Sequence, residues 1–269
     1  MFTHPIPLPT PPAPIPAPPP GSVDERAEVT VTPAWLAGDD TNDAVFKAAR
    51  AAGWPTAIDD MGNGHARSTS GRVYLGFLPE ELPEELHPFT PLDLDGPGHE
   101  IRGIWTIDGR PYGDLAWTMS FNDARGIISG IHVPQEIVAA AVTELAAPGH
   151  QEPDWLADPG DHDTVWAVLR AAGWSIDHAA DDDITAHAPD RTARLLHKPS
   201  YHTDEYSVRP HAGGWTLTAG PSAAPNCPGR WEAEFSGRTP AGVITAVMRV
   251  MTGPGLPRHP EDVPAHARR

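Results

Sequence analysis

The pattern of apolar and polar positions along this chain occurs twice. Pro33–Pro79 and Pro153–Pro199 align without a gap, and tryptophans, glycines and apolar helix positions fall at the same places in both. A long internal repeat is typical of a duplicated structural unit. It predicts two similar tandem domains, residues 28–148 and residues 149–253. The anchors of the alignment are Trp35-Leu36-Ala37 over Trp155-Leu156-Ala157, and Arg50-Ala51-Ala52-Gly53-Trp54 over Arg170-Ala171-Ala172-Gly173-Trp174.

Each copy begins with an amphipathic helix. Thr41 and Asp161 share a repeat position that suits a helix N-cap, and apolar residues follow at helical spacing. Gly53 comes where a glycine ends a helix, and the tryptophan after it is expected to pack back on the last turn. We therefore interpret Trp54, and Trp174 in the second copy, as core residues rather than ligand-binding residues.

Alternating residues predict strands in the rest of each copy. Hairpin strands are expected at 64–68 and 73–78, and again at 184–188 and 193–197. Two further strands and an apolar closing helix complete each copy. The order helix, four strands, helix predicts an α+β fold, in which each domain is an antiparallel sheet of about four strands with two helices on one face.

Strand alternation sorts the hairpin residues into two faces. The apolar face is expected to pack under the helices, and the opposite face is polar and locally cationic. Arginine beside an aromatic ring suits carboxylate or phosphate groups, so this outer face is the predicted binding surface. The same polarity also suits a solvated face or the seam between the copies. The apolar members are Ala66, Ser68, Val73, Leu75 and Phe77, with Ile184, Ala186, Ala188, Ala193 and Leu195. The candidate binding residues are Arg67, Arg72, Tyr74, His187 and Arg194.

Three segments show no such pattern. Residues 1–27 are proline-rich, which predicts an extended, disordered arm; a spacer is the preferred interpretation, and a docking peptide for a proline-binding groove is the alternative. Residues 80–99 are rich in proline and acidic side chains and predict an exposed loop. Residues 254–269 lack periodicity and predict a flexible tail.

Composition and charge narrow the choice of partner. The 269 residues carry a formal net charge of −17, from 36 acidic and 19 basic side chains. Such a field repels nucleic acid and anionic lipid. The single cysteine, Cys227, indicates a reducing compartment. Because the first residues lack a signal-peptide pattern and no apolar stretch is long enough to span a membrane, we expect a cytoplasmic protein.

Catalytic and metal-binding patterns are missing from the sequence. It contains no hydrolase elbow or phosphate-binding loop, and Cys227 has no neighbouring base. The fourteen histidines show no zinc spacing, and His187 and His197 fall on opposite faces of the predicted sheet. The acidic clusters at 39–40 and 181–183 lack the spacing of a calcium loop. We therefore expect no catalytic residue, no metal and no cofactor, and a protein that is not an enzyme.

Four short elements together suggest a known family. They are Val31–Gly38, Ala51-Ala52-Gly53-Trp54, the hairpin turn before an arginine, and Trp231-x-Ala233-x-Phe235 with Thr239-Pro240. With these elements the chain resembles an actinobacterial domain of unknown function named for a Ser-Pro-Asp-Tyr (SPDY) motif. The resemblance covers about residues 29–252 and implies tandem copies, but no activity. At the motif itself the chain has Ala188-Pro189-Asp190-Arg191 and Ser68-Thr69-Ser70-Gly71, without tyrosine at the fourth position.

These observations favour a non-enzymatic binding or interaction protein with two SPDY-like domains. The expected partner is a protein or a small anionic ligand. The alternative is a nucleic-acid-binding regulator, since helix, strands, helix is also the order of a double-stranded-RNA module. Such a module needs cations at the start of its second helix, whereas this chain has Pro134-Gln135-Glu136 and Pro240-Ala241-Gly242 there. Nucleic acid is therefore the less favoured partner.

Overall fold

The computed structural model describes residues 28–38, 42–78, 104–123, 133–179, 182–199, 213–220, 230–261 and 263. The proline-rich arm, the acidic loop, Thr41, the acidic pair at 39–40 and Cys227 lie outside these residues. Within them the chain forms the predicted α+β combination of an antiparallel sheet and helices. The helical elements are the short 3₁₀ turn η1 Ala34–Leu36, α1 Asp43–Ala51, α2 Gln135–Leu145, α3 Pro153–Ala157, α4 Asp163–Ala171 and α5 Ala241–Met251.

The strands follow the repeat. The first copy contributes β2 Thr56–Ile58, β3 Gly64–Arg67, β4 Val73–Phe77, β5 Trp105–Gly109 and β6 Trp117–Asp123. The second copy contributes β7 Ser175–His178, β8 Ile184–His187, β9 Ala193–Lys198, β10 Gly214–Ala219 and β11 Trp231–Ser236. Two further strands, β1 Val29–Val31 and β12 Leu256–Arg258, lie at the ends of the described chain.

The two copies share one sheet. It has ten strands in the order β2-β3-β4-β5-β6-β11-β10-β9-β8-β7. The copies meet where β6 pairs with β11, with Phe121 opposite Ala233 and Met119 opposite Phe235. The prediction of separate four-stranded sheets is therefore wrong. It missed β2 and β7, the strands directly after each first helix, and it missed the pairing that joins the halves.

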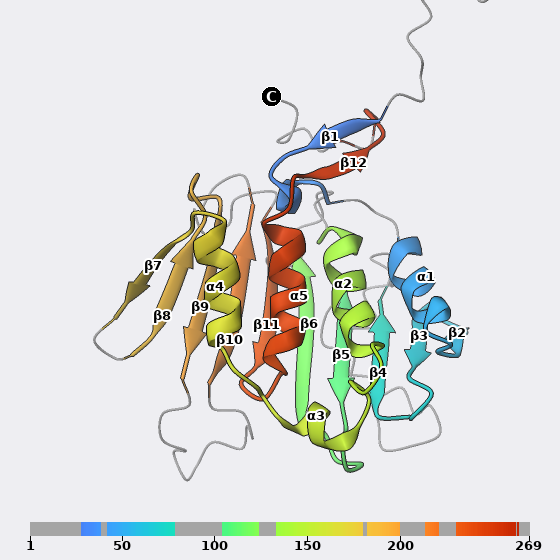
Figure 1. Cartoon of the computed structure of the whole chain (residues 1–269). Helices are drawn as coiled ribbons and strands as arrows, with labels where there is room; N and C mark the ends of the chain where they lie inside the picture. Colours follow the sequence, from blue (N-terminus) through green and yellow to red (C-terminus); the bar gives the residue numbers. More distant parts are fainter. Residues whose placement is uncertain are drawn as a thin grey trace, which may run out of the picture.

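The helices cover one face of this sheet. Figure 1 shows α1, α2, α5 and α4 side by side across that face, so helices of both copies form one layer. Within this layer α2 packs on α5, α1 on α2, and α4 on α5. The buried side chains of both copies form a single hydrophobic cluster between the helices and the sheet. We call the opposite face of the sheet the outer face.

The glycine end predicted for the first helix of each copy is confirmed, whereas the residue that caps α4 is His162 and not the expected Asp161. Gly53 and Gly173 have φ of 74° and 79° directly after α1 and α4, a left-handed conformation that glycine adopts without strain. The backbone N–H of Trp54 then donates to the carbonyl oxygen of Ala49 at 3.0 Å, the bond of a glycine-terminated helix. Both tryptophans are buried. The predicted apolar hairpin face is also confirmed. Ala66, Ser68, Val73, Leu75, Ala186, Ala188, Ala193 and Leu195 are buried, and Phe77 and Ile184 are partly buried against the same hydrophobic cluster.

A short segment of each copy packs against the other copy. Trp117 in β6 donates its indole N–H to the carbonyl oxygen of Leu156 in α3 at 2.8 Å. Reciprocally, Trp231 in β11 bonds the carbonyl oxygen of Trp35 in η1. Each repeated Trp-Leu-Ala segment thus supports the last strand of the copy to which it does not belong. This exchange makes the halves interdependent.

The stretch predicted as a flexible tail contains a strand. β12 pairs with β1 as a separate two-stranded sheet, and Thr30 lies opposite Pro257. Arg258 fixes this strand, because its Nη atoms bond both carboxylate oxygens of Glu136 at 2.8 Å and its Nε bonds the carbonyl oxygen of Ala37 at 2.8 Å. Residues 256–258 therefore correct the prediction of a tail without regular structure.

Candidate functional site

The predicted binding residues occupy two separate places on the outer face. Arg67 lies opposite Tyr74 in the β3–β4 hairpin, and His187 lies opposite Arg194 in the β8–β9 hairpin. The strands β5, β6, β11 and β10 separate β4 from β9. At about 4.8 Å per strand, the two hairpins are roughly 24 Å apart. The five candidate residues therefore do not form a single contact surface.

Tyr74 does not contribute to an exposed surface. Its side chain is buried at 4% exposure, and its hydroxyl lies 2.7 Å from Nδ1 of His65. Nε2 of His65 in turn lies 3.1 Å from Oδ2 of Asp59. Sequence reasoning missed this chain of contacts, since the repeat position of Asp59 carries Ala179 in the second copy and gives no repeated signal.

Burial and nearby carboxylates keep Tyr74 protonated. Burial, followed by the nearby carboxylates of Asp108 and Asp59, raises the pKa of Tyr74 well above its usual value. Burial acts to raise the pKa of Asp59 as well, but hydrogen bonds from Asn63 and His65 outweigh it and leave that pKa below its usual value. An ionised Asp59 beside a neutral phenol forms a buried structural network in the first half.

The second hairpin presents a cluster of basic side chains. Arg191 lies in its turn with φ of 62° and is exposed, Arg194 in β9 is exposed, and His187 is half-buried. We call these three residues the cationic corner. Burial, and then the positive charge of Arg191, lowers the pKa of His187, while Asp177 acts in the opposite direction from 3.7 Å. Arg191 was not among the predicted binding residues, because the sequence pattern marked it only as a turn position.

No carboxylate among the described residues lies within ion-pair distance of Arg191 or Arg194. Asp190, which precedes Arg191, accepts hydrogen bonds from the backbone N–H and the hydroxyl of Thr192 at 3.1 and 2.8 Å. The carboxylate of Asp190 is thereby engaged in hydrogen bonds within the turn. Neither guanidinium group therefore forms an ion pair with a carboxylate of the described residues.

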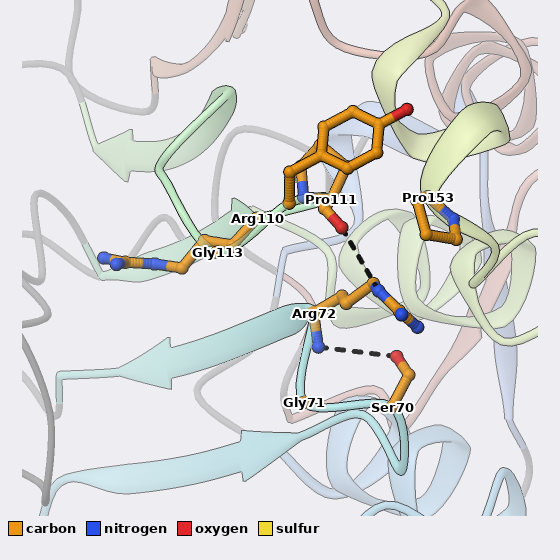
Figure 2. Close-up of a pocket in the computed structure, with 8 residues that line it drawn as sticks. Ser70, Gly71, Arg72, Arg110, Pro111, Gly113 and Pro153 are labelled. Carbon is orange, nitrogen blue, oxygen red and sulfur yellow. Dashed lines mark hydrogen bonds between the residues drawn. The ribbon is translucent and has the colours of Figure 1, made fainter.

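Arg72 lies in a different environment from the other candidates. Its Nε donates to the carbonyl oxygen of Pro111 at 3.2 Å, and its backbone N–H lies 3.4 Å from Oγ of Ser70. It lines a surface pocket of about 450 Å³. Figure 2 shows the Arg72 side chain extending toward Pro153, whereas that of Arg110 extends away from it. The lining residues are Ser70, Gly71, Arg72, Arg110, Pro111, Tyr112, Gly113 and Pro153.

His187 and His197 lie on opposite faces of the sheet, as predicted. Ile184, not His187, lies opposite His197, so His197 faces the helices. There it lies 4.1 Å from Trp215 and 5.0 Å from His162, measured between ring centroids. Nδ1 of His197, Nε2 of His162 and Nε1 of Trp215 are buried and have no hydrogen-bond partner in the part of the chain that the structure describes. Among the described residues no three His, Cys, Asp or Glu side chains come together as metal ligands.

A membrane-spanning helix would have to be long and apolar, and none of the helices in the described ranges meets both conditions.

Comparison with known proteins gives one similarity. Neither the curated proteins nor the solved structures that were compared include a match to the chain. A family model does match, from His187 in β8 to Pro254 after α5. This stretch holds all three residues of the cationic corner. Residues 187–254 are thus similar to SPDY, a domain of unknown function (DUF317).

Proposed function

We propose that this chain is a non-enzymatic binding protein that holds a carboxylate- or phosphate-bearing partner at the cationic corner. The proposal treats both halves as SPDY-like units in a tandem arrangement of actinobacterial type. Only the second half carries the corner, since Arg67, Gly71 and Tyr74 occupy the positions of His187, Arg191 and Arg194 in the first half. A reducing compartment such as the cytoplasm suits a chain with one cysteine.

The observation that carries the proposal is the unpaired state of Arg191 and Arg194. In a chain of net charge −17, exposed guanidinium groups find carboxylates easily, yet these two have none within ion-pair distance among the described residues. Planar guanidinium groups bind carboxylate and phosphate oxygens in a bidentate manner. Burial lowers the pKa of His187 most, and the positive charges of Arg191 and Arg194 lower it further.

A non-enzymatic role is supported by the polar network of the first half, because the tyrosine at its end is buried and protonated. Asp59, His65 and Tyr74 form a chain of polar contacts in the order carboxylate, imidazole, phenol, which is the order of an acid–base relay. The phenol at its end is buried and its pKa is raised. A nucleophile must be accessible and activated, and Tyr74 is neither.

The test measures binding of a fluorescently labelled poly-glutamate peptide and of inorganic phosphate to the whole chain. Replacing Arg191 and Arg194 together by alanine removes two charge-assisted contacts, so we expect affinity to fall roughly tenfold or more. The matched control is the double variant R170A/R249A, which removes the same charge from exposed positions at the ends of α4 and α5. The control should bind like the wild type.

The nucleic-acid alternative is tested in the same assay. A labelled RNA duplex of about 16 base pairs is titrated over a range of salt concentrations. We expect no binding, because the first turn of α2 carries the acidic Glu136, whose carboxylate is bonded to Arg258, where such a module needs cations. Tight duplex binding that weakens steeply with salt would establish the alternative. Equal affinity of the wild type and R191A/R194A for the peptide and for phosphate would refute the cationic corner.

A further inference from the structure

The second half holds a tryptophan where the first half has open space. Trp35 of η1 donates its indole N–H to the hydroxyl of Thr192 at 2.9 Å, directly after the β8–β9 turn. Its ring meets that of Trp174 edge-on at 5.9 Å. The side chain is buried at 5% exposure. In this half, an indole from the other copy therefore fills the space beside the hairpin turn.

The corresponding tryptophan of the first half is placed elsewhere. Trp155 stacks on His150, with ring centroids 4.1 Å apart and planes 5° apart. It is only half-buried. The cause is a shift of one residue in the exchanged segment: Trp117 bonds the carbonyl oxygen of Leu156, whereas Trp231 bonds that of Trp35 itself. One residue along a helix turns a side chain by about 100°, so Trp155 leaves the β3–β4 turn.

The pocket at Arg72 lies beside the β3–β4 turn, at the repeat position that the Trp35 indole fills in the second half and that Trp155 leaves empty. Its walls include Pro111 and Tyr112 from the β5–β6 turn, and Tyr112 is held by a bond from its hydroxyl to Asp154 at 2.9 Å. At about 450 Å³ it has room for a bicyclic ring. Four lining residues, Ser70, Gly71, Arg72 and Pro153, occupy the repeat positions of Asp190, Arg191, Thr192 and Pro33.

Arg72 changes the chemistry of this space. It stands where Thr192 accepts the indole N–H in the second half, so a cation replaces a hydrogen-bond acceptor. Its Nε is engaged by Pro111, and no carboxylate among the described residues pairs with its Nη atoms. Figure 2 shows the guanidinium group inside the pocket, between the β3–β4 turn and Pro153.

We propose that this pocket binds a small aromatic carboxylate. The ring takes the position that the Trp35 indole holds in the second half and packs on Pro111, Tyr112 and Pro153. The carboxylate accepts hydrogen bonds from the Nη atoms of Arg72. This site is separate from the cationic corner, and it stands or falls independently of the function proposed there.

The probe is indole-3-acetate, titrated into the whole chain and followed by calorimetry. Indole and acetate, which supply the ring and the carboxylate separately, are the matched ligands. We expect saturable binding of indole-3-acetate in the millimolar range or tighter, and roughly tenfold weaker binding by R72A. R194A should bind like the wild type, which separates this site from the cationic corner.

A second variant guards against misfolding of R72A. Tyr112 is 70% exposed, so Y112A removes one wall with little effect on the fold and should weaken binding several-fold. Three results would overturn the proposal: no saturation of the wild type up to about 10 mM, equal affinity of R72A and the wild type, or indole bound as tightly as indole-3-acetate.

Discussion

The indole N–H of Trp231 donates a hydrogen bond of 3.0 Å to the backbone carbonyl oxygen of Trp35. The two residues belong to different copies of the repeat, and the bond is buried. Together with the bond from Trp117 to Leu156, it ties each copy's last strand to the other copy's short helical segment. We therefore expect the two copies to fold together as one unit.

Replacing Trp231 by phenylalanine should lower the free energy of unfolding by about 1–3 kcal/mol. The ring volume is largely kept, but the carbonyl oxygen of Trp35 loses its donor in a buried place. Urea denaturation followed by circular dichroism measures the change. W155F is the matched control. Because Trp155 is only half-buried, this variant should lose clearly less unfolding free energy than W231F. Equal losses in the two variants would contradict a specific role for the bond.

Separated copies should not fold alone. A fragment of residues 28–148 keeps η1 but lacks β11, and a fragment of residues 149–263 keeps α3 but lacks β6. Each fragment exposes a seam strand and part of the shared cluster. We expect non-cooperative thermal unfolding for each fragment and a cooperative transition after mixing. A cooperative transition in either isolated fragment would show two independent domains instead.

Stability should fall in acid because of His197. Burial, and then the neighbouring His162, lowers the pKa of His197 to about 4, whereas an unfolded histidine titrates near about 6.5. Between these values the unfolded chain binds a proton that the folded chain does not. The stabilisation is therefore complete above about pH 6.5 and is lost as the pH falls toward about 4.

Variants at His197 and at its repeat counterpart Phe77 test whether His197 causes the loss of stability in acid. Phe77 packs on Trp105 as His197 packs on Trp215, with ring centroids 4.3 and 4.1 Å apart. H197F should show a smaller loss of stability than the wild type between about pH 7 and pH 5, and F77H should show a larger one. Unfolding midpoints in urea at the two pH values measure both. An unchanged pH dependence in H197F would assign the effect to other groups.

The Arg258–Glu136 ion pair should contribute more to the free energy of unfolding than an exposed ion pair does. The Arg258 side chain is 6% exposed and that of Glu136 29%, and the two groups form a bidentate contact that fixes β12. R258A should cost about 2–3 kcal/mol of unfolding free energy.

K198A is the comparison for R258A. Lys198 lies 3.8 Å from Asp183 and is 61% exposed, so its removal should cost under about 1 kcal/mol. If the two variants lose the same stability, β12 is not held by this pair.

The sequence alone determined the features that depend on residues close along the chain. The repeat placed the first helix of each copy, its glycine end and the buried tryptophan after it, because caps and helical periodicity involve only a few neighbouring residues. Alternation sorted Val73 from Tyr74 and Ile184 from His187 correctly, because the side-chain period of a strand is local. It missed β2 and β7, whose residues are mostly exposed and therefore show no apolar alternation.

The tertiary structure decided everything that depends on residues far apart. Alternation shows which face a residue takes but not what covers that face, so the burial of Tyr74 was not foreseeable. Pairing of β6 with β11 depends on two edges meeting, and β12 is too short for a periodic signal and gains its partner only from β1. The one-residue difference between the two Trp-Leu-Ala contacts, which leaves the pocket at Arg72, is likewise invisible in a sequence that reads the same at both places.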